Sequence, residues 1–326
     1  MLSGKTIMVT GGTGSFGKAF VKETLKNYST KKIIIYSRDE FKQYEMAKRF
    51  KSDKLRFFLG DVRDPNRLHR ALEGVDFVIH AAAMKQVPAS EYNPFEAVQT
   101  NIIGAQNLIN AAIDVGVKKV FALSTDKACN PVNLYGATKL CSDKLFVAAN
   151  AYSGKHETRF SVVRYGNVIG SRGSVVPLFR DLKETGEIPI TDERMTRFWI
   201  TLPQAVKFVI DSLHLMHGGE LYIPKIPSMK ITDLARAIAP DCKIKNIGIR
   251  PGEKLHEVMI SGDDSRNLYE LVDRYVKMPD FPFWETIPPE NSQKMNEGWE
   301  FASNTNDMWL SVDELRDLLE NKDVME

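Results

Sequence analysis

A glycine-rich turn near the N-terminus constrains the fold of this chain more than any other feature. The run Gly11-Gly12-Thr13-Gly14-Ser15-Phe16-Gly17 follows an apolar segment, Thr6 to Thr10, and opens a helical segment, Gly17 to Tyr28. Glycines at this spacing let the backbone approach a pyrophosphate closely, and a helix N-terminus favours its negative charge. Because strand, loop and helix occur in this order, the run predicts a dinucleotide site. Its candidate residues are Gly11, Thr13, Gly14, Ser15, Phe16 and Gly17.

Short apolar segments alternate with longer helical ones through the first half of the chain. Helical segments such as Pro94 to Val115 separate the apolar ones. Strands alternating with helices at this interval indicate βαβ units and a parallel sheet, and nearly continuous apolar runs are typical of strands covered on both faces. We therefore predict an α/β fold with a Rossmann-type doubly wound parallel sheet. After the first strand, the candidate strands are Lys32 to Tyr36, Leu55 to Leu59, Phe77 to Ala81, Val120 to Ser124 and Phe160 to Arg164.

The second half of the chain has a different pattern. Seven prolines between Pro177 and Pro251 divide it into short pieces. We expect residues 1–166 to form a nucleotide-binding domain that carries the catalytic residues. Residues 167–326 are expected to form mainly a smaller α/β substrate lobe, with some segments returning to the first domain. Near the end, Met278 to Phe301 is predicted to be an ordered surface loop, and Ser311 with Glu314 predicts the capping box of a last helix.

Composition and charge argue against several classes of partner. The net charge of +2, from 44 basic and 42 acidic residues, gives no sign of a nucleic-acid or membrane surface. No apolar run approaches the roughly 18 residues of a membrane span, and no N-terminal targeting signal is expected. The three cysteines lack metal-like spacing, which favours a reducing, cytoplasmic location. His256-Glu257 lacks the second histidine of a zinc motif, so no metal site is expected.

The end of the second predicted strand bears on cofactor choice. Sites that prefer NAD place an acidic residue there, on the ribose 2′-hydroxyl. Ser37 and Arg38 instead offer a hydroxyl and a guanidinium, which suit a 2′-phosphate, and Lys42 adds charge one turn on. We therefore expect NADP rather than NAD. Two observations argue against NADP. Asp39 is a nearby carboxylate, and Arg38 can also be interpreted as a solvated surface residue.

Segments after the third and fourth predicted strands complete the expected cofactor cleft. Asp61-Val62 is placed to contact an adenine edge. Ala82, within Ala81 to Ala83, lines the cleft with a small side chain. Lys85 follows directly and is a candidate for contact with cofactor or substrate.

Two pairs of proton-transfer groups occur close together in the sequence. Tyr135 and Lys139 are four residues apart and therefore share one face of a helix. A lysine ammonium near a phenol is expected to lower its pKa from about 10 towards neutrality, which makes Tyr135 a candidate base for a substrate hydroxyl. Asp126 and Lys127 form a second pair. An enzyme that only moves a hydride does not need this second pair, whereas one that also removes water does.

Taken together, these residues resemble the extended short-chain dehydrogenase/reductase family over nearly the whole chain. The segment Ser124-Thr125-Asp126-Lys127-Ala128 is similar to that of nucleotide-sugar 4,6-dehydratases that invert C5; retaining dehydratases carry Asp-Glu at the matching pair. Membrane-linked inverting relatives often have Met where this chain has Tyr135. Further matches are Tyr92-Asn93-Pro94, Asn101, Arg164 to Asn167, Gly170 to Ser174, Met195 to Phe198 and Arg250 to Glu257.

This resemblance implies a substrate, a product and a mechanism. The substrate is UDP-N-acetylglucosamine and the product UDP-2-acetamido-2,6-dideoxy-β-L-arabino-hexos-4-ulose, the first step of pseudaminic acid biosynthesis. After C4 oxidation, Lys127 removes the C5 proton and Asp126 protonates the departing C6 hydroxyl. This requires the pKa of Lys127 to be lowered by burial and nearby cations, and that of Asp126 to be raised by desolvation. The implied substrate-binding residues are Lys85, Thr125, Asn167, Arg172, Arg197, Arg250, Glu253 and Asn306.

Other interpretations remain open at this point. A nucleotide-sugar 4-epimerase needs Tyr135 and Lys139 but not Asp126 and Lys127. A redox-sensing NADP-binding protein without turnover is a further alternative, although a sensor would be free to lose the tyrosine–lysine pair. His80 and His256 are interpreted as structural. The resemblance also implies a homo-oligomer, either a dimer or a hexamer.

Overall fold

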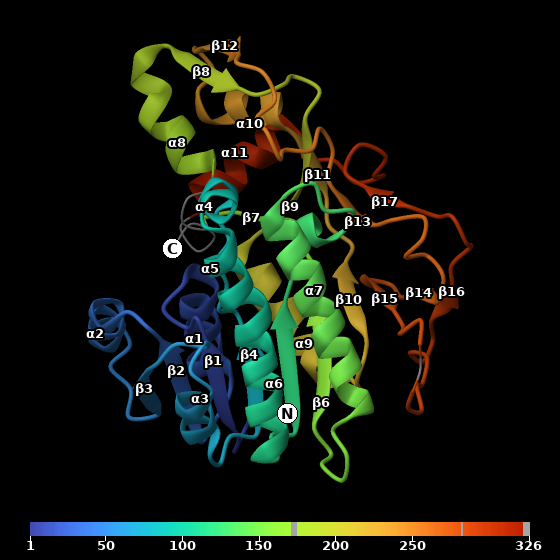
Figure 1. The fold of residues 1–326 in the computed structure, drawn as a ribbon. Helices are drawn as coiled ribbons and strands as arrows, with labels where there is room; N and C mark the ends of the chain where they lie inside the picture. Colours follow the sequence, from blue (N-terminus) through green and yellow to red (C-terminus); the bar gives the residue numbers. More distant parts are fainter. Residues whose placement is uncertain (171–174, 282, 322–326) are drawn as a thin grey trace.

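In the computed structural model, which describes residues 1–170, 175–281 and 283–321, a ten-stranded sheet forms the centre of the molecule (Figure 1). Its strand order is β16-β14-β15-β10-β6-β5-β4-β1-β2-β3. The strands from β3 to β10 run parallel, and β15, β14 and β16 add an antiparallel edge. The order 3-2-1-4-5-6 is that of a doubly wound fold. The predicted fold class is therefore confirmed.

The predicted strands agree with the observed ones to within one residue at each end. The segment from Met278 to Phe301, however, is not simply a loop, because it contributes the edge strand β16, which pairs with β14. The parallel strands are β1 (Thr6–Thr10), β2 (Lys32–Ser37), β3 (Leu55–Leu59), β4 (Phe77–His80), β5 (Lys119–Leu123), β6 (Arg159–Val163) and β10 (Leu221–Pro224). The antiparallel strands are β14 (Leu268–Glu270), β15 (Arg274–Lys277) and β16 (Gln293–Lys294).

Helices cover both faces of this sheet. Helix α9 packs with α1 on one face, while α6 lies between α3 and α7 on the other. The predicted helix from Pro94 to Val115 consists of α5, a π-helical turn (Gln99–Ile103) and α6. No helix in the described ranges combines the length and apolar character needed to cross a membrane. The helices are α1 (Ser15–Asn27), α2 (Glu40–Arg49), α3 (Pro65–Leu72), α4 (Val87–Tyr92), α5 (Pro94–Val98), α6 (Gly104–Asp114), α7 (Leu134–Ala148) and α9 (Leu202–Leu215).

The remaining elements form a second group above the large sheet in Figure 1, and most of them share an apolar core of their own, whereas β13 and β17 pack into the core of the large sheet. Its helix α11 begins with the predicted capping box: Glu314 N–H donates to Ser311 Oγ (3.3 Å), and Ser311 N–H donates to Glu314 Oε2 (2.8 Å). Three small sheets accompany the helices, in the orders β11-β9-β7, β12-β8 and β13-β17. The elements are β7 (Asn167–Val168), α8 (Val175–Leu182), β8 (Glu187–Ile190), β9 (Thr196–Ile200), β11 (Ser228–Lys230), α10 (Ile231–Ile238), β12 (Lys243–Asn246), β13 (Val258–Ile260), β17 (Phe301–Ala302) and α11 (Val312–Glu320).

The glycine-rich turn packs too tightly for side chains at three positions, Gly11, Gly12 and Gly17. Gly11 has a φ of +64°, and a Cβ there would lie 2.8 Å from the backbone nitrogen of Ala82, just beyond β4. A Cβ on Gly17 would lie 2.3 Å from the carbonyl oxygen of Gly12. Helix α1 can therefore start directly beneath the turn only because Gly17 has no side chain.

We expect Gly17→Ala to destabilise the protein, because the added methyl group meets backbone that cannot move aside. Overpacking of this kind costs about 1–3 kcal/mol, which urea unfolding at constant pH would measure. Gly262→Ala is the matched control, since a Cβ there has its nearest neighbour at 3.4 Å, an ordinary contact. Equal stability of the two variants would contradict the packing argument.

Candidate active site

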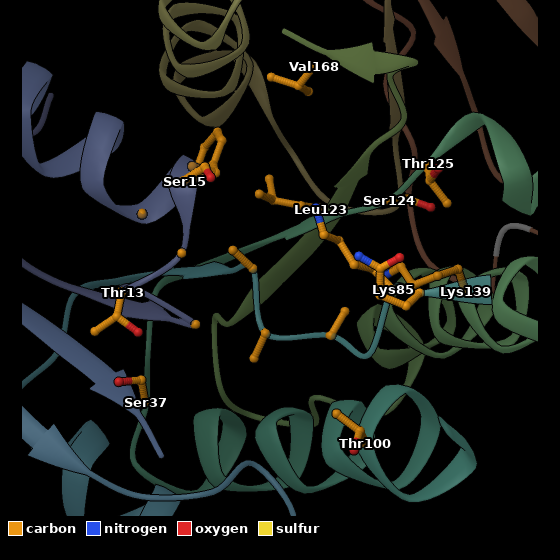
Figure 2. Close-up of a pocket in the computed structure, with 18 of the residues that line it drawn as sticks. Thr13, Ser15, Ser37, Lys85, Thr100, Leu123, Ser124, Thr125, Lys139 and Val168 are labelled. Carbon is orange, nitrogen blue, oxygen red and sulfur yellow. The ribbon is translucent and has the colours of Figure 1, made fainter. Parts of the chain in front are cut away.

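A cavity of about 660 Å³ opens at the carboxyl ends of the parallel strands. Figure 2 shows Thr13, Ser15 and Ser37 on one side of it, and Lys85, Thr125 and Lys139 on the other. This is where open α/β sheets bind ligands. Every residue predicted to bind the cofactor lines the cavity, namely Gly11, Thr13, Gly14, Ser15, Phe16, Gly17, Ser37, Arg38, Asp39, Lys42, Asp61, Val62, Ala82, Lys85, Tyr135 and Lys139.

The glycine-rich turn has the features of a phosphate cradle. Gly14 precedes α1 and provides no side-chain cap, so the first N–H groups of the helix are not covered by one. At Gly11 the turn approaches the chain after β4 so closely that no side chain fits between them. Backbone N–H groups and the helix dipole favour an anion at such a position. The residues present therefore fit the pyrophosphate of a dinucleotide.

Charged groups are arranged in pairs beyond the end of β2. Arg38 is largely exposed and lies 3.4 Å from a carboxylate oxygen of Asp61. Asp39 caps α2 by accepting a hydrogen bond from Lys42 N–H (2.9 Å), and it also pairs with the Lys42 ammonium. Ser37 Oγ accepts a hydrogen bond from Gln43 Nε2 (3.1 Å). Ser37, Arg38 and Asp39 all line the cavity, and each also has a partner within the protein.

Asn101, in the π-helical turn, holds the chain after β4 in place. Its Oδ1 accepts from Met84 N–H (2.8 Å), and its Nδ2 donates to Met84 O (2.9 Å) and to Thr138 Oγ1 (3.0 Å). Thr138 in turn donates to the carbonyl of Tyr135 (2.8 Å). Asn101 therefore ties the segment that carries Lys85 to the helix that carries the catalytic candidates.

Tyr135 and Lys139 lie one turn apart on α7, and both line the cavity. Burial lowers the pKa of Lys139, and the Asp143 carboxylate opposes this. Burial raises the pKa of Tyr135 to about 12, although the charge of Lys127 and a hydrogen bond with Thr125 act to lower it. The prediction that Lys139 brings this phenol towards neutrality is therefore wrong for the protein alone, because desolvation prevails and the opposing cation is Lys127.

A buried network of charged and polar side chains lies next to Lys139. Asp143 lies one turn further along α7 and accepts a hydrogen bond from Ser124 Oγ (2.7 Å). Arg164, 3% exposed, has a guanidinium nitrogen 3.8 Å from Asp143, and it donates to Asp264 (3.1 Å). Burial raises the pKa of Asp143, with Lys139 and Arg164 opposing it. The start of the Ser124 to Lys127 segment is thus anchored to α7.

Lys127 lies between two buried carboxylates. Its Nζ is 3.0 Å from Asp126 Oδ1 and 3.4 Å from Glu257 Oε1. Asp126 is completely buried, and the Lys127 side chain is 27% exposed and reaches the cavity. Burial acts to lower the pKa of Lys127, but Asp126 and Glu257 outweigh it and raise that pKa above its usual value. The prediction of a lowered lysine pKa is therefore wrong for this state, in which Lys127 carries a proton.

Three of the predicted substrate-binding residues line the cavity: Lys85, Thr125 and Asn167. Thr125 also donates to Asp126 Oδ1 (2.9 Å), which links it to the acid–base pair. Arg172 lies outside the described residues. The cavity therefore receives side chains from the ends of β4, β5 and β6, as expected for a parallel sheet.

The other four predicted substrate-binding residues, Arg197, Arg250, Glu253 and Asn306, do not line this cavity. Arg197 is buried and donates to the carbonyls of Thr196, Leu255 and Lys254. Arg250 is exposed and pairs with Glu253. Asn306 donates to Ile226 O (2.9 Å) and Ser228 Oγ (3.0 Å) within the second group of elements. In this structure their polar groups serve internal contacts.

Trp199 is a cavity residue that the sequence did not indicate. It lies in β9 directly opposite Asn167 of β7, and both side chains border the cavity. Within the described part of the chain, the buried Trp199 Nε1 and Asn167 Oδ1 have no hydrogen-bond partner. A buried donor and a buried acceptor, on residues paired in the strand register, thus lack hydrogen-bond partners within the described part of the chain. The sequence analysis also did not identify Glu257, although this residue ends the segment Arg250 to Glu257.

Among the described residues, no group of acidic, histidine or cysteine side chains could hold a metal.

Comparison with known families places this geometry in context. The family described as polysaccharide biosynthesis protein matches residues 7–279. A protein of Campylobacter jejuni subsp. jejuni (strain 81-176), named UDP-N-acetylglucosamine 4,6-dehydratase (inverting), is 59% identical over 98% of each chain. A protein of Rickettsia bellii, named UDP-glucose 4-epimerase, is 42% identical over 84% of this chain and 83% of its own.

Solved structures show the same architecture. Pen from Bacillus thuringiensis superposes with a TM-score of 0.92 at 38% identity, covering 99% of each chain. DesIV of Streptomyces venezuelae, a dTDP-glucose 4,6-dehydratase solved with NAD and TYD bound, has a TM-score of 0.69 at 25% identity. That likeness covers 77% of this chain and 86% of DesIV. A nicotinamide cofactor is therefore consistent with both the fold and the cavity.

We expect His80, at the end of β4, to make the protein less stable in acid. Its Nδ1 is hydrogen-bonded to Thr10 Oγ1 (2.8 Å), and burial, reinforced by the Lys139 charge, lowers its pKa from 6.5 to about 3. The unfolded chain therefore binds one more proton than the folded protein between these values, so stability falls as the pH falls through that window.

His80→Gln should remove the contribution of this histidine to the pH dependence of stability. The slope of the unfolding free energy against pH should then fall by about 1 kcal/mol per pH unit between pH 6 and 4. Chemical unfolding at a series of pH values measures the slope. His69→Gln, on the exposed side of α3, is the control. A slope that His80→Gln leaves unchanged would show that His80 is not the titrating group.

Proposed function

This chain belongs to the polysaccharide biosynthesis protein family, and we propose that it is a UDP-N-acetylglucosamine 4,6-dehydratase that inverts C5. The observation that carries the proposal is Lys127, which lines the cavity together with Tyr135 and pairs with the fully buried Asp126 behind it. It supplies one acid and one base in addition to the group that deprotonates a hydroxyl. A 98% overlap with an inverting dehydratase at 59% identity supports the same assignment.

The first chemical task is to make the C5 proton removable. Tyr135 is positioned to take the proton of the C4 hydroxyl, with Thr125 and Lys127 acting against the burial of the phenol. When bound, the nicotinamide cofactor supplies the hydride acceptor at C4 and later the hydride donor at C6. A ketone at C4 acidifies the neighbouring C5 position, so a side-chain amine then suffices as base.

The ion pair of Lys127 and Asp126 already holds the correct number of protons for the elimination. A single proton shift along the 3.0 Å contact, from Nζ to Oδ1, converts it into a neutral amine and a neutral acid. Lys127 then takes the C5 proton and Asp126 gives its proton to the C6 oxygen, which leaves as water. The Lys127–Asp126 pair is then ionic again, with the former C5 proton on Lys127. After the hydride returns to C6, C5 takes up a proton from solvent on the opposite face, which inverts its configuration, and Tyr135 returns the proton of the C4 hydroxyl to solvent.

The acetamido group of the substrate has a matching site beside the cavity. Asn167 Oδ1 is an acceptor and Trp199 Nε1 is a donor, and both are buried without a partner among the described residues. An acetamido group carries one N–H and one carbonyl oxygen, which are the complementary groups. Unpaired buried polar atoms are costly, so a ligand that pairs them gains affinity. This supports an N-acetylated sugar over glucose itself.

NADP is proposed as the cofactor on the basis of the groups beyond β2. Ser37, Arg38 and Lys42 line the cavity and present a hydroxyl and two cations. The competing carboxylate, Asp39, is partly neutralised by Lys42 and by the N–H group it caps. Arg38 pairs with Asp61 and Lys42 with Asp39, and the proposal is that a 2′-phosphate binds to these two cations, whose hydrogen-bond donors suit phosphate oxygens.

A 4-epimerase remains the alternative function, since such proteins are among the relatives. An epimerase does not need an acid–base pair at C5 and C6, so Asp126 and Lys127 favour the dehydratase. A redox sensor without turnover would need neither pair. We further propose a cytoplasmic protein that carries out the first step of pseudaminic acid biosynthesis as a homo-oligomer, dimer or hexamer. The strongly exposed aromatic residues Tyr92 and Phe95, on α4 and α5, support a protein contact there.

Denaturing the purified protein should release NADP(H), which chromatography distinguishes from NAD(H). Arg38→Ala should weaken NADP binding by about 1.5–3 kcal/mol, because a charge-assisted contact is lost. Arg70→Ala is the control and should leave NADP binding unchanged. Arg70 lies on the remote helix α3, is as exposed as Arg38 and forms an ion pair with Glu73. Recovery of NAD alone would refute the cofactor assignment.

Lys127→Ala should separate oxidation from elimination. We expect it to retain substrate and cofactor but to form the dehydrated product about 10²–10⁴-fold more slowly, the usual contribution of a general base. Reduced cofactor should accumulate on the enzyme and absorb near 340 nm. Tyr135→Phe is the control, because it blocks the earlier step and should show neither product nor absorbance.

In D₂O, wild-type product should carry deuterium at C5 with inverted configuration, read by NMR. Product from Lys127→Ala at the wild-type rate would exclude Lys127 as the base. Retained configuration at C5 would place the enzyme among the retaining dehydratases, and release of a 4-epimer would favour the alternative function.

A further inference from the structure

Glu257 completes a buried cluster of four charges that the proposed reaction does not yet use in full. Two carboxylates, Asp126 and Glu257, alternate with two cations, Lys127 and Arg197. The contacts are 3.0 Å and 3.4 Å from Lys127 Nζ to the carboxylates, and 3.8 Å from Arg197 Nε to Glu257 Oε1. Glu257 is 2% exposed. A carboxylate buried to this extent needs a reason, because an uncompensated charge there is strongly unfavourable.

The backbone holds Glu257 firmly. It directly precedes β13, its N–H donates to Ser303 Oγ (2.9 Å), and its carbonyl accepts from Ser303 N–H (2.8 Å). Arg197 is fixed by its hydrogen bonds to the carbonyls of Leu255 and Lys254, in the chain just before Glu257. The carboxylate therefore approaches Lys127 from a rigid support in the second group of elements, opposite Asp126.

We propose that Glu257 is a positioning residue for the elimination: it holds the Lys127 ammonium against Asp126 and keeps a proton on this pair up to alkaline pH. The inference rests on the proposed function. It goes beyond that function by assigning to a third carboxylate the task of maintaining the one mobile proton that Lys127 and Asp126 share.

The charges around Lys127 support this role. Loss of its proton would leave Asp126 and Glu257 as two neighbouring anions, with Arg197 as the remaining cation of the cluster. Lys85 after β4, Arg197 and burial itself act in the opposite direction, and Tyr135 also faces Lys127 from α7. The net effect is a pKa of Lys127 above its usual value. Without the negative charge of Glu257, the nearby cations and burial lower the pKa of Lys127 further. The Lys127–Asp126 pair should then lose its proton at lower pH.

The test is the pH dependence of product formation from UDP-N-acetylglucosamine by the cofactor-loaded enzyme. Glu257→Gln keeps the size of the side chain and removes its charge. We expect the alkaline limb of the profile to move to lower pH by about one to two units, while the 340 nm signal of the oxidised-substrate state still forms. Glu257→Asp, which keeps the charge, should restore the position of the limb even if turnover is slower.

Glu220→Gln is the matched control. Glu220 is equally buried at 2% exposure, but it accepts hydrogen bonds from Ser161 and His217 just before β10, away from the cavity. It should lower stability without moving the limb. The proposal is overturned if the alkaline limb of the pH profile does not move in Glu257→Gln, or if it moves by the same amount in Glu220→Gln. Absence of 4-keto-6-deoxy product from the wild-type protein at every pH instead overturns the proposed function, and this inference with it.

A measurement on the wild-type protein keeps the inference testable if Glu257→Gln does not fold. Trace labelling of lysines with acetic anhydride between pH 7 and 11, read peptide by peptide by mass spectrometry, reports when each amine loses its proton. We expect Lys127 to become reactive at higher pH than the exposed Lys207. Reactivity of Lys127 at the same or lower pH overturns the proposal.

Discussion

Hydrogen bonding between parallel strands determines which parts of this chain meet. The register pairs Thr10 with His80, His80 with Ala122, and Ala122 with Val162, so four strands end at nearly the same level. The glycine turn, the Lys85 segment and the Ser124 to Lys127 segment follow directly. Because parallel strands require long crossovers, residues far apart in sequence converge at one edge. The cavity is a consequence of that register.

Electrostatics at this edge is governed by burial as much as by neighbouring charges. Desolvation raises the pKa of Tyr135 and would lower that of Lys127, yet two carboxylates reverse the direction for the lysine. The protein alone therefore holds Lys127 protonated, in an ion pair with Asp126, and Tyr135 as a neutral phenol. The proton count is nevertheless that of the reactive form, so a proton shift within one hydrogen bond is enough to reach it. This reconciles an ion pair in the structure with a mechanism that needs a neutral amine.

The second group of elements contributes rigidity as well as contacts. Arg197 uses its guanidinium to tie together the backbone before Glu257, and Asn306 joins segments around β11. Both side chains are charged or polar, and both were predicted from the sequence to bind the substrate. In this structure both side chains instead donate hydrogen bonds to backbone carbonyls, which would otherwise lack partners.

Much of the fold and of the site followed from the sequence because the relevant signals are short-range. The glycine turn, the apolar strands and the Tyr135–Lys139 spacing each depend on a few consecutive residues, and all of the predicted cofactor residues line the cavity. Asp126 and Lys127 are adjacent, so their pairing was also readable. The tertiary structure decided what depends on distant segments: that Glu257 reaches Lys127, that Trp199 stands opposite Asn167, that Arg197 is consumed internally, and in which direction burial moves each pKa. No local pattern encodes these, because they arise from which surfaces pack together and how much water that packing excludes.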